Sequence, residues 1–301
     1  MSDSQIQLVH SQTGNIFPAA PNGSVLFSSV PAGWQGITVE CHRISALELP
    51  EHYIDGHRLA VTIGQPVHYE WKEGNAWRQK LLQPGAFCLQ THGDLNFPRW
   101  WGDFEFLAIA LDPTFVKQAF QETGVSDNIR FQTRRGAADA AIADFTHHFK
   151  TELVSGSYCG ALYGESLALA FALHLIEQHS DHPQKLRKPA GKLSSRQLKQ
   201  LIEYVHAHLS EELSLVDLAQ QMNLSTFHFA RLFKHSLGLS PHQYLLHTRV
   251  ERAKKLIAIA GKPDLTAIGL QVGFYDQAHF TKAFKRVVGM PPKGFFKQVA
   301  S

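Results

Sequence analysis

The stretch Phe229-Ala-Arg-Leu-Phe-Lys-His-Ser-Leu-Gly-Leu-Ser-Pro241 returns in altered form as Phe280-Thr-Lys-Ala-Phe-Lys-Arg-Val-Val-Gly-Met-Pro-Pro292. An offset of 51 aligns both phenylalanines, the basic residue between them, the following lysine, the glycine and the final proline. A repeat of this kind indicates that one supersecondary unit occurs twice. We expect Gly238 and Gly289 to end the two helices, because glycine is typical of the position after a helix C-terminus.

Each copy has the pattern of a helix-turn-helix. In the first, residues 214–221 predict a short helix, the next three residues a turn, and Ser225 is a good N-cap for the second helix. In the second copy Asp276 has the same role. We place the motifs at about 214–237 and 265–288. A long helix over 241–259 separates them.

Apolar spacing assigns a core face and an outer face to each second helix. Phe229 and Phe233, like Phe280 and Phe284, recur at the interval of one helical turn and predict the core face. The outer faces hold the candidate DNA contacts, which are Thr226, Phe227, Arg231, Lys234, Gln277, Thr281, Lys282 and Lys285.

Each candidate can be interpreted as a specific DNA contact or in a less specific way. Arg231 suits a bidentate contact to guanine, and its alternatives are a phosphate contact or an ordinary solvated arginine. Thr226 and Phe227 suit a thymine methyl group, whereas Lys234 and Lys285 suit phosphate. Lys282 suits either base or phosphate. His228 and His279, just before the inward phenylalanines, are interpreted as packing or phosphate-facing residues.

The charge is divided unevenly along a chain of 301 residues that is 44% hydrophobic. Residues 1–190 hold 14 Lys+Arg against 19 Asp+Glu, and residues 191–301 hold 15 against 7. The length allows two domains, and the basic one could meet a polyanion. We divide the chain into a sensor and dimerisation domain (1–185), a linker (186–194) and a DNA-binding domain (195–301).

Short strand-like runs separated by Gly, Pro and Asn turns predict a sandwich or small barrel over about 20–112. Helices follow over about 113–180. The helix at 160–179 has two apolar stripes, so it is either wedged between the barrel and a neighbouring helix or forms a homodimer contact.

We expect a cytoplasmic location, because the three cysteines (Cys41, Cys88 and Cys159) are scattered and the N-terminus is unlike a signal peptide. The apolar stretch 161–176 is too interrupted to cross a membrane. A ligand pocket or an ordinary aromatic core would use His57, Trp71, Trp77 and Trp100. The sequence has no compact His-x-His…Glu grouping of metal ligands around His52, His57, His68 and His92. It also has no phosphate-binding loop and no nucleophile elbow. We therefore predict no metal, no cofactor and no enzymatic activity.

Residues 195–298 resemble the double helix-turn-helix domain of AraC-type (arabinose-operon regulator-like) transcription factors. The resemblance rests on the repeat, on Leu218-Ala219, and on Val272-Gly273-Phe274 with Gln277. It departs from the family at Gly269, where alanine is usual and where the short helix could be loosened. Ala278 stands in place of a common serine. Phe295-Phe296-Lys297 stands in place of the Tyr-Arg that usually closes the domain.

The resemblance implies an α+β protein with an N-terminal cupin-like β-barrel, appended helices and an all-α C-terminal domain. It implies a sequence-specific regulator, with Gln277 reading adenine. It also implies an effector-responsive activator whose partners are double-stranded DNA, a small molecule and RNA polymerase. The alternatives are an architectural protein with little sequence preference, a metal-dependent cupin enzyme with a DNA-binding tail, and a DNA-repair alkyl transferase.

Overall fold

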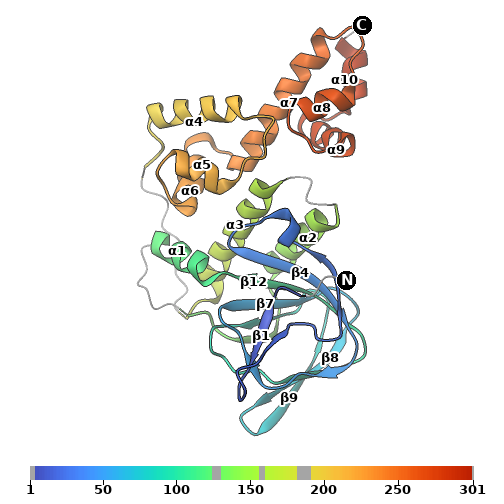
Figure 1. Ribbon diagram of the computed structural model, residues 1–301, viewed down its shortest axis with the longest axis vertical. Coiled ribbons are helices and arrows are strands. Elements are labelled where there is room, and N and C mark those ends of the chain that lie inside the picture. The colour runs from blue at the N-terminus through green and yellow to red at the C-terminus, as the bar shows by residue number, and fades with distance from the viewer. Residues whose placement is uncertain (1–3, 124–129, 156–159, 182–190, 300–301) are drawn as a thin grey trace. The chain divides into compact units, whose positions relative to one another are not determined.

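The N-terminal half alternates short apolar strands with turns, and in the computed structural model these strands form antiparallel sheets (Figure 1). The structure describes residues 4–123, 130–155, 160–181 and 191–299. The strands are Gln7–His10 (β1), Ile16–Pro18 (β2), Ser24–Ser28 (β3), Ile37–Ile44 (β4), Leu47–Glu48 (β5), His52–Tyr53 (β6), His57–Thr62 (β7), Val67–Glu73 (β8), Ala76–Leu82 (β9), Phe87–Gln90 (β10), Pro98–Trp101 (β11), Phe104–Leu111 (β12) and Arg134–Ala137 (β13). A 3-10 turn, η1, covers Val30–Ala32.

Three sheets result, with strand orders β13-β10-β7-β12-β4-β3, β5-β11-β8-β9 and β2-β1-β6. Among the described residues these pairings do not close into one ring, so the expected barrel takes the form of open sheets. The largest sheet has β12 at its middle, where a strand covered on both faces reads as continuously apolar. Side chains of β12 meet those of β8 and β11 in one core that includes Tyr69, Trp100 and Phe106.

The first helices are Pro113–Thr123 (α1), Ala140–Val154 (α2) and Ala161–His179 (α3). The chain divides into two compact units, residues 1–157 with 167–187 and residues 158–166 with 188–301. The first turns of α3 thus belong to the second unit. Most apolar side chains of α3 are buried within the single chain, so no second subunit is needed to cover them.

The second unit is entirely helical in the residues described. Its helices are Ser195–Ala207 (α4), Leu215–Gln221 (α5), Thr226–Leu237 (α6), Pro241–Ile259 (α7), Leu265–Gln271 (α8), Gln277–Val288 (α9) and Pro292–Val299 (α10). The α+β fold class and the helical C-terminal domain are confirmed. Within the described ranges, no helix combines the length and apolarity that crossing a membrane requires.

Candidate nucleic-acid interface

The first helix-turn-helix is built by capping residues at both helix starts. Ser214 and Asp217 form a reciprocal capping box at the start of α5. The Ser225 hydroxyl accepts a hydrogen bond from the amide of His228 at 3.1 Å, and Gly238 ends α6 with φ 74°. These polar caps satisfy amides that a helix cannot pair internally, so α6 begins and ends where the sequence predicts.

The second helix-turn-helix uses aspartates in the same positions. Asp264 caps α8, and Asp276 accepts a hydrogen bond from the amide of His279 at 2.7 Å at the start of α9. Gly289 ends α9 with φ 86°. The two copies therefore share their boundaries although their sequences differ.

The turns of the two motifs match closely but differ in length. Asn223 (φ 53°) and Gly273 (φ 92°) both adopt the left-handed conformation. In each turn the next amide bonds to the carbonyl five residues earlier, in Leu224 to Ala219 (3.1 Å) and Phe274 to Gly269 (3.0 Å). The second turn then has one extra residue. The offset between the copies is consequently 50 before the turn and 51 after it.

Gly273 is fixed by a close approach as well as by its φ. A Cβ atom there would lie 2.5 Å from the backbone oxygen of Leu209 and 2.8 Å from Nε of Arg249. Gly269 is also tightly placed, since a Cβ atom would lie 3.1 Å from the side chain of Phe280. Its missing methyl group therefore lets α8 approach α9 closely, and does not simply loosen the helix.

Arg249 joins the long helix α7 to the segment that follows α4. Its side chain is buried, and it donates hydrogen bonds from Nε to the carbonyl of Leu209 (3.0 Å) and from Nη2 to that of Glu211 (2.7 Å). Burial lowers its pKa to about 10. The spacing contained the signal, because Arg249 lies four residues from both Leu245 and Ala253 on the core face of α7.

α7 supports both motifs. Its first half packs on α6, where the rings of Phe233 and Tyr244 lie 5.6 Å apart. Its second half joins α8 and α9 in a core that includes Val250 and Phe280 (Figure 1). One helix thus holds the two second helices in a defined separation.

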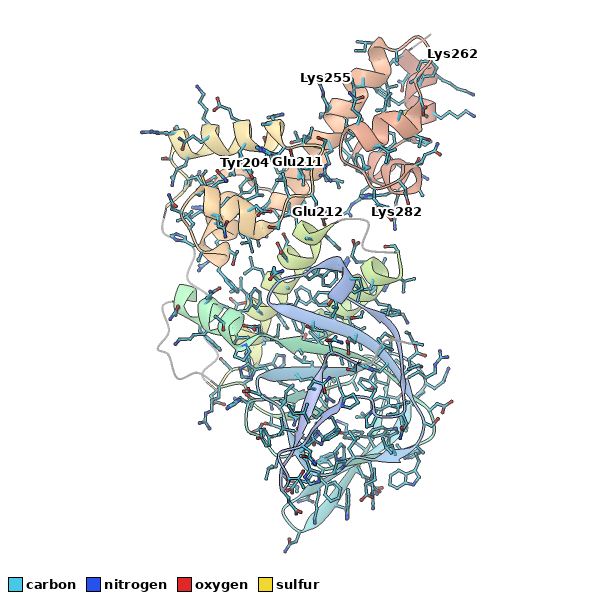
Figure 2. The ribbon with its side chains drawn as sticks, viewed as in Figure 1. Tyr204, Glu211, Glu212, Lys255, Lys262 and Lys282 are labelled. Carbon is cyan, nitrogen blue, oxygen red and sulfur yellow. The ribbon has the colours of Figure 1, made fainter. Side chains whose placement is uncertain are left out.

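The structure leaves most predicted DNA contacts accessible. Lys234 on α6 is exposed, while Thr226 and Arg231 are half-buried. Of the candidates on α9, Thr281 is half-buried, and Gln277, Lys282 and Lys285 are exposed. Figure 2 shows the Lys282 side chain on the outside of α9. Each second helix therefore carries accessible basic groups.

Phe227 is the exception, and its predicted contact with a thymine methyl group is wrong. Its side chain is fully buried, so it cannot reach a thymine methyl group. The buried face of α6 is wider at its start than the spacing of Phe229 and Phe233 implies. In the second motif the equivalent Ala278 is exposed, so the two copies differ at this position.

His279 is a packing residue. It is buried, its ring meets Phe274 edge-on at 5.0 Å, and burial is the main cause that lowers its pKa to about 4. The imidazole is therefore neutral at physiological pH and supplies no charge to DNA. His228, its counterpart on α6, is half-buried.

The four proposed pocket residues of the N-terminal unit do not line one cavity together. Trp100 lines a cavity in the core between the sheets, and its Nε1 donates to the carbonyl of Ser45 at 3.0 Å. Trp77 is exposed, with the guanidinium of Arg99 3.7 Å from its ring centre. Trp71 packs at the edge of the core.

His57 takes part in a separate contact and does not line this cavity. Its Nδ1 lies 2.8 Å from the hydroxyl of Thr91, and its ring meets Phe131 at 4.8 Å. Burial lowers its pKa to about 4. Of the four predicted pocket residues, this cavity therefore includes Trp100 alone.

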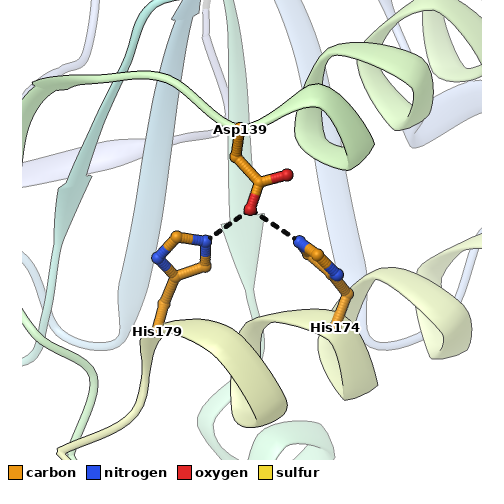
Figure 3. Close-up of side chains that lie close together, drawn as sticks. All are labelled: Asp139, His174 and His179. Carbon is orange, nitrogen blue, oxygen red and sulfur yellow. Dashed lines mark hydrogen bonds and ion pairs between the residues drawn. The ribbon is translucent and has the colours of Figure 1, made fainter. Parts of the chain in front are cut away.

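Asp139 joins two histidines at the start of α2 (Figure 3). Oδ1 caps the helix by accepting from the amides of Ala141 and Ile142 at 2.8 and 3.2 Å. Oδ2 lies 2.9 Å from Nε2 of both His174 and His179. Burial opposes the charge of the carboxylate, but these imidazole hydrogen bonds outweigh it and lower its pKa to about 2.

Two imidazoles and a carboxylate are also groups that hold transition metals. A metal-bound imidazole normally donates its second N–H to a partner, whereas Nδ1 of His179 is buried without one among the described residues. We therefore interpret the cluster as a hydrogen-bonded tie between α2 and α3. Sequence reasoning missed it because the residues lie 35 and 40 positions apart.

Residues 218–298 match the family model described as a helix-turn-helix domain. The probable transcriptional regulator LumQ of Photobacterium leiognathi is 39% identical over 89 residues, 30% of this chain and 36% of LumQ. The MmsAB operon regulatory protein of Pseudomonas aeruginosa is 33% identical over 105 residues, 35% of this chain and 34% of that protein. The chain thus spans about a third of the length of these two relatives.

The chain carries an AraC-type helix-turn-helix domain. The match to this AraC-type domain begins within α5 and ends in α10, so it includes both second helices. The solved structure of a regulator from Chromobacterium violaceum is described as containing an AraC-type DNA-binding domain. It is 30% identical to this chain, and the match covers 35% of this chain and 94% of that one with a TM-score of 0.33. LumQ and the Chromobacterium violaceum protein are described as transcriptional regulators, and the Pseudomonas aeruginosa protein as an operon regulatory protein.

Proposed function

We propose that the protein is a sequence-specific DNA-binding regulator of transcription whose helices α6 and α9 enter neighbouring segments of one major groove. The observation that carries the proposal is the pair of capped helices, each with accessible basic side chains, packed on the single helix α7. α7 has 19 residues and is about 28 Å long at 1.5 Å per residue. Adjacent major-groove segments lie about 34 Å apart, a similar spacing.

We divide the contacts by the chemistry of each side chain. The exposed amines of Lys234, Lys282 and Lys285 suit phosphate, because a lysine is a flexible point charge. Arg231 offers a planar fork that matches the edge of guanine, and Gln277 offers an amide that matches adenine. Thr226 and Thr281 are placed to contact base edges or phosphate.

The test is a selection of bound sites from a randomised DNA pool, followed by affinity measurements over a range of salt concentrations. We expect a consensus sequence, and an affinity that falls steeply with salt because bound lysines release counterions. Arg231→Ala should lose about 1–3 kcal/mol on the consensus site and relax the preference there. Lys285→Ala should weaken all sequences about equally.

Lys262→Ala is the matched control. This lysine is exposed in the loop between α7 and α8, outside both second helices (Figure 2). Its removal should leave the consensus and the affinity unchanged. A pool that yields no consensus would instead support the sequence-tolerant architectural protein.

The proposal extends to control by a small-molecule effector bound to the N-terminal unit, to activation through RNA polymerase, and to a cytoplasmic location. The similarity to a probable transcriptional regulator and to an operon regulatory protein supports the regulatory role on which this extension depends. Dimerisation through residues 160–179 remains a prediction, and the burial of α3 within one chain gives it no support.

A further inference from the structure

The turn before α9 holds one residue more than the turn before α6, and that residue is Tyr275. Leu224 and Phe274 occupy matching places in the two turns, because the amide of each bonds to the carbonyl five residues earlier. In the first motif the N-cap Ser225 follows Leu224 directly. In the second, Tyr275 stands between Phe274 and the N-cap Asp276. Tyr275 therefore has no counterpart in the first motif.

The packing role that usually belongs to the position of Tyr275 is already filled. The residue before an N-cap often packs against the fourth residue of the helix. In the first motif that residue is Leu224, which is half-buried. In the second motif the ring of Phe274 lies 5.3 Å from that of Phe280, the fourth residue of α9, and both are buried. Tyr275 is left 75% exposed, although its ring is large and mostly apolar.

Tyr275 adjoins the N-terminal end of α9, the end of a second helix that contacts base edges in helix-turn-helix proteins. The first two residues of the helix, Gln277 and Ala278, are exposed and carry no charge. Asp276 uses its carboxylate to cap the helix. The exposed Lys282 comes more than one turn later. The start of α9 therefore presents a ring, an amide and a methyl group, which are groups suited to bases.

We propose that Tyr275 is a further specificity-determining residue, whose ring packs against the 5-methyl group of a thymine in the DNA segment contacted by α9. This role rests on the proposed function. The methyl group of thymine is the apolar group that base pairs expose in the major groove, and apolar side chains recognise it there. The contact is favourable because it removes both the ring and the methyl group from water. A neutral phenol brings no charge to phosphate, for which α9 already has Lys282 and Lys285.

The test uses the full chain and a duplex that carries the consensus selected from the randomised DNA pool. Each thymine of that duplex is replaced in turn by uracil, which pairs with adenine in the same way and lacks only the 5-methyl group. At one of these thymines the replacement should weaken binding about 4-fold, the effect of burying one methyl group. This scan needs no variant of the protein.

Tyr275→Ala assigns the effect to the ring. This variant should bind the thymine duplex at least about 4-fold more weakly, because the same contact is lost from the protein side, and uracil at that position should then make no difference. Tyr275→Phe keeps the ring and should keep both the affinity and the effect of uracil. Leu270→Ala is the matched control, since it removes another exposed apolar side chain, on α8, and should behave as the original protein does. Tm should stay almost unchanged in all three variants, because these side chains are exposed.

Three results would overturn the role of Tyr275: a consensus with no thymine that is sensitive to uracil, a uracil effect that persists in Tyr275→Ala, or a Tyr275→Phe variant that binds as weakly as Tyr275→Ala. The last result would assign the contact to the hydroxyl group. A pool that yields no consensus with the original protein refutes the proposed function, and the role of Tyr275 with it. A consensus that is bound equally well by the original protein and by Tyr275→Ala refutes the role of Tyr275 alone.

Discussion

Replacing Arg249 by methionine removes the guanidinium that joins α7 to the loop after α4. Two hydrogen bonds are lost, to the carbonyls of Leu209 and Glu211. Glu211 is exposed, so its carbonyl can bind water instead at little cost. Leu209 is buried, and an unsatisfied buried carbonyl costs about 1–3 kcal/mol.

Two further effects set the size of the loss. Each hydrogen bond from a charged donor contributes about 1.5–3 kcal/mol, while removal of a buried guanidinium relieves part of its desolvation. The net expectation is that the second unit loses about 2–3 kcal/mol of local stability. Amides in α7, α8 and α9 that open with this unit should then exchange with solvent roughly 30- to 150-fold faster.

Hydrogen exchange measured by mass spectrometry on the full chain is the assay, because it reports each helix separately. Arg252→Met is the matched control, since Arg252 is exposed on the same helix three residues away. Its exchange should change by less than about 0.5 kcal/mol. If Arg249→Met and Arg252→Met exchange alike, the assignment of Arg249 as a structural tie is refuted.

Gly273→Ala should destabilise the second unit by about 3 kcal/mol in urea unfolding, because φ is left-handed there and the added Cβ atom clashes with Leu209. Gly238→Ala should cost only about 1–2 kcal/mol, because its added Cβ atom meets no atom within 4 Å. Phe227→Ala should lower stability by about 3–5 kcal/mol because the ring is fully buried; a loss of DNA affinity without a loss of stability would contradict that placement. The lowered pKa of Asp139 stabilises the fold above pH 4, and this contribution of about 1–2 kcal/mol is lost as pH falls from 4 to 2. Asp139→Asn, which keeps the helix cap, should show a flatter pH dependence of unfolding there, and identical slopes would refute the link.

The boundaries of the helix-turn-helix motifs follow from local chemistry. Ser225 and Asp276 cap the second helices, and Gly238 and Gly289 end them, as the repeat predicts. These contacts join residues close in the chain, so a single sequence contains the information. The shared turn geometry was harder to predict, because the extra residue Tyr275 shifts the second copy by one position.

A doubled helix-turn-helix with basic second helices is evident in the sequence alone, since caps, spacing and charge are local properties. Which of these side chains are accessible becomes evident in the folded chain. Phe227 turns inward and Arg249 joins two distant segments, because burial depends on neighbours elsewhere in the chain. The same reason applies to Arg58 and Arg135, which lie 77 positions apart in the sequence and line one small cavity in the core of the N-terminal unit.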